Sequence, residues 1–292
     1  MGIKVGFIGL GLMGGPMVKR LLAAQFDVAI WNRSTEKMAA FNEYGARSCQ
    51  SIRDLVEQSD AILLCVSDTQ AVEAVVFDSD GVAEAGAPGK VIIDFSSIDP
   101  MRTREMASEL KNICGMDWID APVSGGTAGA ENGSLIIMAG GDATVLDAVR
   151  SIFLPLGERL THMGPVGAGQ MTKLCNQMVV ANNAVVIAEM MALGRKAGVD
   201  VDKLADALAG GFADSKPLQI LAPQMAARDF TLKWKVATLQ KDLEGAINLA
   251  QVLEMNVPMT LQGNQLLSRH IEGGAAQLDL STVINLYEEH EK

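Results

Sequence analysis

The sequence has too few positive charges to suit a nucleic-acid backbone. Its 292 residues carry 24 Lys and Arg against 35 Asp and Glu, a formal net charge of -11. Proteins that bind phosphate backbones need clustered Lys and Arg to displace counterions. Proline is also scarce, with 9 residues, whereas hydrophobic residues make up 49% of the chain. We therefore expect an ordered globular protein with no nucleic-acid partner.

Cysteine and histidine are too sparse and too scattered for a metal centre. The four cysteines lie far apart without a Cys-x-x-Cys pair, and the three histidines show no ligand spacing. Neither a zinc site nor a disulfide framework is indicated. We expect no bound metal and a reducing, cytoplasmic location.

No hydrophobic run has the features of a membrane span. The first apolar segment, residues 5–13, is short and interrupted by glycine, so it makes a poor signal sequence. The most apolar later stretch, residues 178–193, is interrupted by Glu189. A spanning helix needs roughly 18 or more uncharged apolar residues. We predict no membrane association.

What the sequence does contain is a regular alternation of short apolar runs with helix-like segments. The runs cover residues 4–8, 28–32, 61–66, 91–95 and 118–120, followed by strand candidates at 135–139 and 159–163. Such alternation is typical of a parallel sheet covered by helices on both faces. We predict an α/β Rossmann domain with a parallel sheet over residues 1–163.

Strand signals disappear in residues 164–292. Residues 169–197 contain no proline and place apolar side chains at helical spacings, which predicts one long, largely buried helix. Further helix-like segments, separated by Gly, Pro or Asn, cover residues 201–209, 217–227, 239–253 and 258–272. We predict an all-α helical domain here.

A glycine-rich turn joins the first predicted strand to the first predicted helix. Gly9, Gly11 and Gly14 form Gly-x-Gly-x-x-Gly directly before the helix-like residues 16–24. The first glycine permits a tight turn, the second lets a pyrophosphate approach the backbone, and the third allows close packing of helix and strand. Phosphates then bind the N–H groups at the start of the helix. In this context the motif predicts a dinucleotide site rather than a turn without a ligand.

The end of the second predicted strand bears on the choice of nucleotide. NAD-selective enzymes usually place Asp or Glu there, about 20 residues after the glycines, to bind the ribose hydroxyls. This sequence has Asn32, Arg33 and Ser34 instead. No acid repels a 2′-phosphate, and Arg33 can pair with one. We predict a preference for NADP(H), with NAD(H) as the alternative cofactor if Arg33 is only a solvated loop charge.

Further motifs occur in order along nearly the whole chain. They are residues 6–17 around the glycine turn, Asp94-Phe-Ser-Ser-Ile98, Asp120-Ala-Pro-Val-Ser-Gly-Gly126, Gly167-x-Gly169-x-x-x-Lys173-Leu-x-Asn176 and Lys241-Asp-Leu243. Together they resemble the β-hydroxyacid dehydrogenase family, which includes 3-hydroxyisobutyrate dehydrogenases and tartronate semialdehyde reductases. The resemblance implies hydride transfer between a nicotinamide and a small carboxylate substrate. It also implies a homodimer or homotetramer whose helical domain serves substrate binding and oligomerisation.

The resemblance further implies roles for individual residues. Besides the motif glycines and residues 32–34, the residues assigned to the cofactor are Leu10, Leu12, Met13, Val66, Ser97 and, from the helical domain, Lys241. Those assigned to the substrate are Ser124, Gly125, Gly126 and Asn176, to which the shared helical face adds Gln177. Lys173 is implied as the catalytic residue.

These residue types suit carbonyl reduction. Hydride addition leaves negative charge on oxygen, so a positioned proton donor lowers the barrier, and a protonated lysine supplies one. Lys173 lies in an apolar helical pattern, with Asn176 and Gln177 three and four residues later. Glycines 125 and 126 expose N–H groups that can hold a carboxylate. Each feature also has an alternative without a role in the reaction. Lys173 can be a surface lysine, Asn176 an amide that packs between helices, and residues 124–126 a turn that ends a strand.

The same residues separate the competing functions. An imine reductase or a catalytically silent dinucleotide-binding module would lack Lys173, and a 6-phosphogluconate dehydrogenase would have a much longer helical domain. Gln177, where the family often has Asn, favours tartronate semialdehyde (2-hydroxy-3-oxopropionate) as substrate. The alternatives are 3-hydroxyisobutyrate, succinic semialdehyde or 4-hydroxybutyrate, threonate and serine-like acids. We place four residues in the wall of the substrate pocket: Phe212, Ser215, Phe230 and Trp234.

Overall fold

The computed structural model describes residues 2–288. The chain divides into two compact units, Met1–Lys173 and Leu174–Lys292. The division falls inside helix α10 (Ala168–Lys196), whereas the sequence patterns place it after residue 163. The difference arises because Gly167, just before α10, and Gln170, in its first turn, donate backbone hydrogen bonds to Asp120 of the first unit's sheet.

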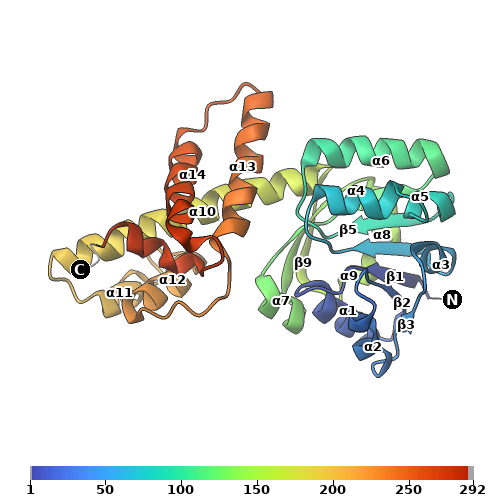
Figure 1. Cartoon of the computed structure of the whole chain (residues 1–292), viewed down its shortest axis with the longest axis horizontal. Coiled ribbons are helices and arrows are strands. Elements are labelled where there is room, and N and C mark those ends of the chain that lie inside the picture. Colours follow the sequence, from blue (N-terminus) through green and yellow to red (C-terminus); the bar gives the residue numbers. More distant parts are fainter. Residues whose placement is uncertain (1, 289–292) are drawn as a thin grey trace. The chain divides into compact units, whose positions relative to one another are not determined.

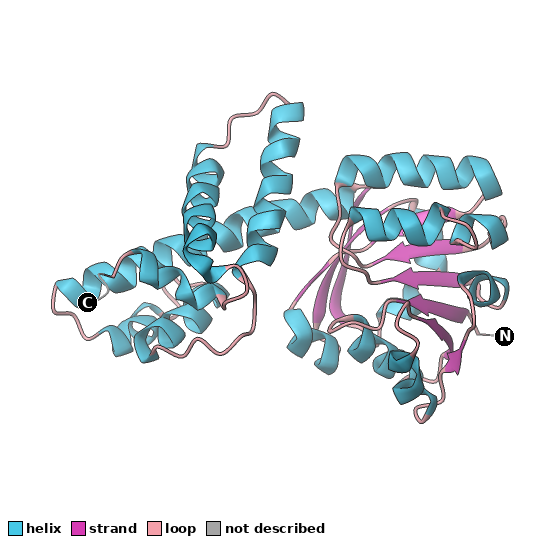
Figure 2. Ribbon diagram, viewed as in Figure 1, coloured by secondary structure: helices cyan, strands magenta, loops and turns pink. Residues whose placement is uncertain are grey.

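The first unit is a nine-stranded sheet with helices on both faces (Figures 1 and 2). The strand order is β3-β2-β1-β4-β5-β6-β8-β7, with β9 paired to β8. The strands are β1 (Lys4–Ile8), β2 (Asp27–Trp31), β3 (Arg47–Ser48), β4 (Ala61–Leu64), β5 (Val91–Asp94), β6 (Asp117–Asp120), β7 (Val123–Ser124), β8 (Leu135–Gly140) and β9 (Gly157–Gly164). Strands β1 to β6 pair with one another only in parallel, which confirms the predicted Rossmann-type sheet.

The last strands depart from the all-parallel pattern. Strand β8 runs antiparallel to both β6 and β7, and β9 runs parallel to β8. The sequence patterns identified β8 and β9 as strands, but an apolar run does not reveal strand direction. A mixed edge on a mostly parallel sheet is common in α/β proteins.

Two apolar layers, one on each face of the sheet, hold the helices. Alternate residues of β1 enter opposite layers, with Phe7 in the layer that holds Leu21 of α1 and Ile8 in the layer that holds Leu55 of α3. This follows from the two-residue period of a strand. The helices are α1 (Gly14–Ala23), α2 (Glu36–Asn42), α3 (Ile52–Glu57), α4 (Thr69–Phe77), α5 (Val82–Ala85), α6 (Pro100–Cys114), α7 (Gly126–Asn132), α8 (Ala143–Ala148) and α9 (Arg150–Phe153).

The strand order places one edge of the sheet to receive ligands. Strands β2 and β4 lie on either side of β1, so the order reverses between β1 and β4. Open α/β sheets bind ligands outside the carboxyl ends of the strands at such a reversal. The segments that follow β1, β2, β4, β5 and β6 all leave the sheet at this edge, which we call the carboxyl edge.

The second unit is helical, as predicted. After α10 it contains the 3-10 helix η1 (Val201–Lys203), α11 (Leu204–Leu208), α12 (Lys216–Ala227), α13 (Val236–Val252), α14 (Pro258–His270), the π-helical η2 (Ile271–Ala275) and the 3-10 helix η3 (Leu280–Leu286). Helices α13 and α14 lie side by side (Figure 1). Apolar side chains of α10, α12 and α13, among them Met191, Leu221 and Leu243, form its core.

Within residues 2–288, α10 alone is long and apolar enough to cross a membrane by length and composition. Of its most apolar window, 44% is buried inside the protein. Ala181, Ala184 and Ala188 contribute that burial by packing into the core of the second unit. The core helix of a helical domain shows the same composition.

Candidate active site

The three glycines of the turn after β1 stand in different surroundings. Gly9 has a φ of 104°, and a Cβ there would lie 2.3 Å from the carbonyl oxygen of Cys65. A Cβ on Gly14 would lie 2.0 Å from the carbonyl oxygen of Gly9. A Cβ on Gly11 would meet no atom within 4 Å. The fold itself therefore requires glycine at positions 9 and 14, while Gly11 faces open space that a ligand can enter.

The residues between these glycines differ in exposure. Leu10 is buried in the core beneath the turn, and the partly buried Met13 packs against the same core. Leu12 is 83% exposed. Met13 occupies the N-cap position of α1 without a side-chain cap, and the first turn of α1 contains no acidic residue. Both features suit an anion at the start of this helix.

Asn32 holds the glycine turn against the end of β2. Its Oδ1 accepts a hydrogen bond from the Leu10 N–H at 2.9 Å, and its Nδ2 donates to the Ser34 carbonyl at 3.0 Å. Both ends of this amide thus serve the protein. Arg33 is exposed, and within residues 2–288 it makes no hydrogen bond or ion pair, so its guanidinium can meet a phosphate.

Val66 and Ser97 follow β4 and β5 at the same edge. The Ser96 hydroxyl accepts a hydrogen bond from the Val66 N–H at 3.0 Å, which joins the two segments. Val66 Cγ1 would lie 3.1 Å from a Cβ on Gly9. Both Val66 and Ser97 are partly exposed. The structure therefore brings Val66 next to the glycine turn, with Ser97 one residue beyond its hydrogen-bond partner.

Ser124 ends β7, Gly125 is the N-cap of α7, and Gly126 is the first residue of α7. Gly125 and Gly126 are exposed and have left-handed φ values of 136° and 61°. A Cβ on Gly126 would meet no atom within 4 Å. The Ser124 hydroxyl is partly exposed and, among residues 2–288, has no hydrogen-bond partner. A short anion could therefore approach this backbone and hydroxyl without steric obstruction.

Lys173 lies near the start of α10 and is only 8% exposed. The turn before it is tied to the end of β6, where Asp120 accepts hydrogen bonds from the N–H groups of Gly167 and Gln170. Burial raises the pKa of Asp120, and these backbone N–H groups oppose that rise. Asp120 belongs to one of the sequence motifs, but the motif does not indicate its role. Its place at the end of an apolar strand was the available signal.

A second buried carboxyl, Asp94, lies beside Asp120. The two residues are Cα partners on β5 and β6. Asp94 Oδ1 accepts a hydrogen bond from the Ser96 N–H at 2.9 Å. Burial raises the pKa of Asp94 to about 7, and Asp120 adds to the rise. Asp94 therefore titrates near neutrality directly beneath the turn that carries Ser97.

In the second unit, the structure brings Asn176, Gln177 and Lys241 together around Asp242. Asn176 Nδ2 donates to Gln177 Oε1 at 2.9 Å, and Gln177 Nε2 donates to Asp242 Oδ2 at 2.5 Å. Lys241 Nζ lies 3.7 Å from Asp242 Oδ1 and is about half exposed. Gln177 is buried, so it orients Asn176 rather than offering its own amide to a ligand.

The proposed pocket-wall residues have other contacts in the second unit. Ser215 caps α12, its hydroxyl accepting from the Leu218 N–H at 3.2 Å. Phe230 and Trp234 pack against the helical core, whereas Phe212 is fully exposed. Three of the four thus have a structural role within their own unit.

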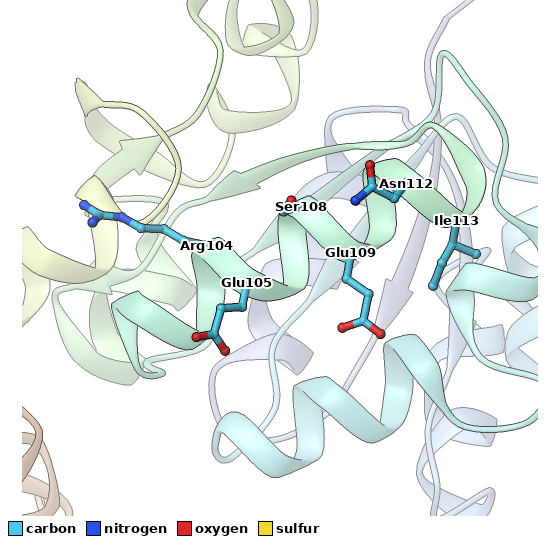
Figure 3. Close-up of a pocket in the computed structure, with 6 residues that line it drawn as sticks. All are labelled: Arg104, Glu105, Ser108, Glu109, Asn112 and Ile113. Carbon is cyan, nitrogen blue, oxygen red and sulfur yellow. The ribbon is translucent and has the colours of Figure 1, made fainter.

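One depression of the surface lies elsewhere, along α6 (Figure 3). It is wide and shallow, and it is lined by Arg104, Glu105, Ser108, Glu109, Asn112 and Ile113. None of the residues predicted for cofactor or substrate belongs to it. Within residues 2–288 no group of three or more His, Cys, Asp or Glu side chains could hold a metal ion.

Two family models match the chain. One, the NAD-binding domain of 6-phosphogluconate dehydrogenase, matches residues 4–164. The other, the NAD-binding domain of NADP-dependent 3-hydroxyisobutyrate dehydrogenase, matches residues 167–287. The two matches fall on either side of the loop that leads into α10.

Individual relatives cover nearly the whole chain. It is 38% identical over 288 residues to a 2-hydroxy-3-oxopropionate reductase of Escherichia coli, covering 98% of this chain and 97% of that protein. It is 32% identical to an NAD-dependent L-serine dehydrogenase of Pseudomonas aeruginosa, covering 98% of each. A solved 3-hydroxyisobutyrate dehydrogenase of Mycobacterium tuberculosis, described with L-serine, matches with a TM-score of 0.90 at 27% identity, covering 99% of this chain and 100% of that one. The chain therefore belongs to the β-hydroxyacid dehydrogenase family of NAD(P)-dependent oxidoreductases.

Proposed function

We propose that the protein reduces a small semialdehyde carboxylate, with 2-hydroxy-3-oxopropionate as its substrate and NADPH as its preferred cofactor. The aldehyde takes up one hydride at carbon and one proton at oxygen, which yields the primary alcohol, glycerate. When bound, the nicotinamide supplies the hydride. Lys173 supplies the proton in this direction and accepts it in the reverse direction.

The observation that carries the proposal is the buried position of Lys173 at the carboxyl edge. A lysine that is only 8% exposed costs free energy to bury, so its retention there favours a chemical role. Its ammonium can hydrogen-bond a carbonyl oxygen, and that interaction strengthens as negative charge develops during hydride addition. A surface lysine on an amphipathic helix would be far more exposed.

The segments at the same edge support the binding of both ligands. Gly11 leaves space for a pyrophosphate, and the uncapped start of α1 suits its charge. The Ser124 hydroxyl and the backbone of Gly125 and Gly126 provide donors for a carboxylate. In the second unit, Gln177 orients the side-chain amide of Asn176, which we assign to a substrate hydroxyl.

The choice of substrate rests on a relative rather than on geometry. The E. coli reductase named for 2-hydroxy-3-oxopropionate is 38% identical over 98% of this chain. The second candidate is oxidation of L-serine or 3-hydroxyisobutyrate, which the P. aeruginosa and M. tuberculosis proteins favour. All of these compounds carry a carboxylate and an oxygen on the β-carbon, so the same residues can bind them.

Nucleotide oxidation measured by absorbance, with a panel of semialdehydes and hydroxyacids, tests the proposal. We expect the highest kcat/KM with 2-hydroxy-3-oxopropionate, and loss of turnover in Lys173→Ala. The matched control is Lys196→Ala, because Lys196 is an exposed lysine at the other end of the same helix. Full turnover in Lys173→Ala would refute the assigned role. Faster turnover of L-serine than of any semialdehyde would favour the second candidate.

The proposed NADP(H) preference depends on Arg33. We expect Arg33→Asp to weaken NADPH binding at least about tenfold while leaving NADH binding largely unchanged, because a charge-assisted contact is worth roughly 1.5–3 kcal/mol. Arg159→Asp is the control, since it makes the same charge change on an exposed residue of β9. Equal effects of the two variants would mean that the preference for NADPH arises from long-range electrostatics and not from a contact with Arg33.

We also propose a homodimer or homotetramer that acts in the cytoplasm on a small carboxylate, with no nucleic-acid or membrane partner. Exposed apolar residues Val179, Val186 and Leu193 follow one line along α10, which supports burial against another copy. Sedimentation equilibrium tests the assembly, and a monomer at micromolar concentration would contradict it.

A further inference from the structure

The start of α10 is anchored to β6 by a buried carboxylate. Asp120 Oδ1 accepts from the Gly167 N–H at 2.7 Å, and its Oδ2 accepts from the Gln170 N–H at 2.8 Å. Asp120 thereby caps a helix from the neighbouring strand rather than from the chain just before it. A carboxylate at this position accepts hydrogen bonds from N–H groups that have no partner within the helix. Its negative charge also interacts favourably with the positive end of the helix dipole.

A second attachment joins the same helical turn to the segment after β5. Gln170 Nε2 donates to the Ser96 carbonyl at 2.7 Å, and Gln170 Oε1 accepts from the Ile98 N–H at 3.2 Å. Gln170 is 1% exposed. The two bonds have opposite polarity, so a neutral primary amide satisfies both, whereas a carboxylate or an apolar side chain does not. They bracket Ser97, which lies between the two bonded residues.

The backbone packing leaves this turn no room to move. A Cβ on Gly169 would lie 2.3 Å from the Met138 carbonyl oxygen, and a Cβ on Gly140 would lie 2.8 Å from the Gly169 nitrogen. The glycine of the motif at position 169 therefore serves close seating of the helix on β8. A helix seated in this way cannot slide along the sheet without breaking its hydrogen bonds to Asp120, Ser96 and Ile98.

Lys173 follows Gln170 by three residues, so both side chains project from the same side of α10. We infer that Asp120 and Gln170 are positioning residues, which fix Lys173 relative to the segment that carries Ser97 and raise kcat without touching substrate or cofactor. This inference rests on the proposed role of Lys173 as proton donor. A misplacement of about 1 Å in a catalytic group can cost about 100-fold in rate.

Gln170→Met tests the inference, because methionine has a similar length and shape but makes neither hydrogen bond. Gln224→Met is the matched control. Gln224 is a glutamine of α12, 6% exposed, whose Nε2 donates to the Asp229 carbonyl at 3.4 Å. For Gln170→Met we expect kcat to fall about 10- to 100-fold and the KM for NADPH to change less than about twofold. For Gln224→Met we expect kcat to match the parent protein.

A second readout needs neither substrate nor nucleotide. Lysines of the intact protein are methylated with formaldehyde and a hydride donor, and the labelling of Lys173 relative to Lys196 is measured by mass spectrometry. We expect the ratio to change severalfold in Gln170→Met and in Asp120→Asn but not in Gln224→Met. A fall in kcat with an unchanged ratio would overturn the inference, as would kcat and a ratio equal to those of the parent. If the parent turns over no substrate, the proposed function fails, and the labelling ratio alone decides whether Gln170 fixes Lys173.

Discussion

Replacing Gly11 by alanine separates the ligand-binding role of the turn from its role in the fold. A Cβ on Gly11 would meet no atom within 4 Å, and its φ lies outside the left-handed range. We therefore expect Gly11→Ala to change the free energy of unfolding of the nucleotide-free protein by less than about 0.5 kcal/mol. The new methyl group stands where a pyrophosphate must approach the backbone. Loss of one charge-assisted contact, roughly 1.5–3 kcal/mol, weakens NADPH binding about 10- to 150-fold.

The comparison is with Gly14→Ala, which places the methyl group 2.0 Å from the Gly9 carbonyl oxygen and 3.0 Å from the Phe7 ring. Overpacking of this kind costs about 1–3 kcal/mol or more, and the better helix propensity of alanine, about 1 kcal/mol, offsets only part of it. Denaturant unfolding without nucleotide gives the stability, and fluorescence titration gives the affinity for NADPH. The reasoning fails if Gly11→Ala binds NADPH as the parent does, or if it loses as much stability as Gly14→Ala.

Two further predictions concern buried polar groups. Burial raises the pKa of Asp94 from 3.8 to about 7. Because the folded pKa lies above the unfolded value, this group contributes stability below about pH 4 and loses that contribution as the pH rises through about 7. The Tm of the parent should therefore fall more between pH 5 and pH 8, roughly, than the Tm of Asp94→Asn, and parallel profiles would contradict this. Gln177→Leu removes the donor to buried Asp242 and should cost about 1–3 kcal/mol in denaturant unfolding. Adding Asp242→Leu should recover part of that loss, and a further loss would show that the pair is not coupled.

The longer strands and helices could be predicted because their apolar residues follow the spacing of a strand or of a helix. Strand β1 was predicted at its observed bounds, and α10 was displaced by one residue at each end. The two-residue strands β3 and β7 were missed, since two residues cannot display a period. The 3-10 helix η3 was missed as well, because its apolar run contains polar Ser281 and Thr282 and follows no helical spacing.

The boundary between the compact units depends on long-range contacts, which sequence patterns do not show. Strand signals end at β9, so the sequence patterns place the domain boundary after residue 163, whereas the compact units divide after Lys173. The residues between belong to the first unit through hydrogen bonds from the backbone of Gly167 and Gln170 to Asp120. A contact between residues so distant in sequence leaves no local trace in composition or spacing.

Some residues of the candidate site could likewise be predicted from local sequence, and others could not. The glycine turn could be predicted because its motif has a local mechanical reason, and the structure shows separate steric settings for Gly9, Gly11 and Gly14. The supporting residues Asp120 and Gln170 could not be assigned, because their partners lie far away in the sequence. Asn32 and Gln177 were predicted as ligand contacts, but each uses its amide within the protein. The other predicted ligand contacts stay predictions.

Transfer of deuterium from NADPH that carries deuterium at both C4 positions to 2-hydroxy-3-oxopropionate, followed by mass spectrometry of the product, tests the proposed reaction most directly. The parent protein should yield glycerate with one deuterium on the former aldehyde carbon, and Lys173→Ala should yield almost none in the same time. NADPH consumption without labelled glycerate would contradict the proposed reaction, and undiminished transfer in Lys173→Ala would contradict the role of Lys173 as its proton donor.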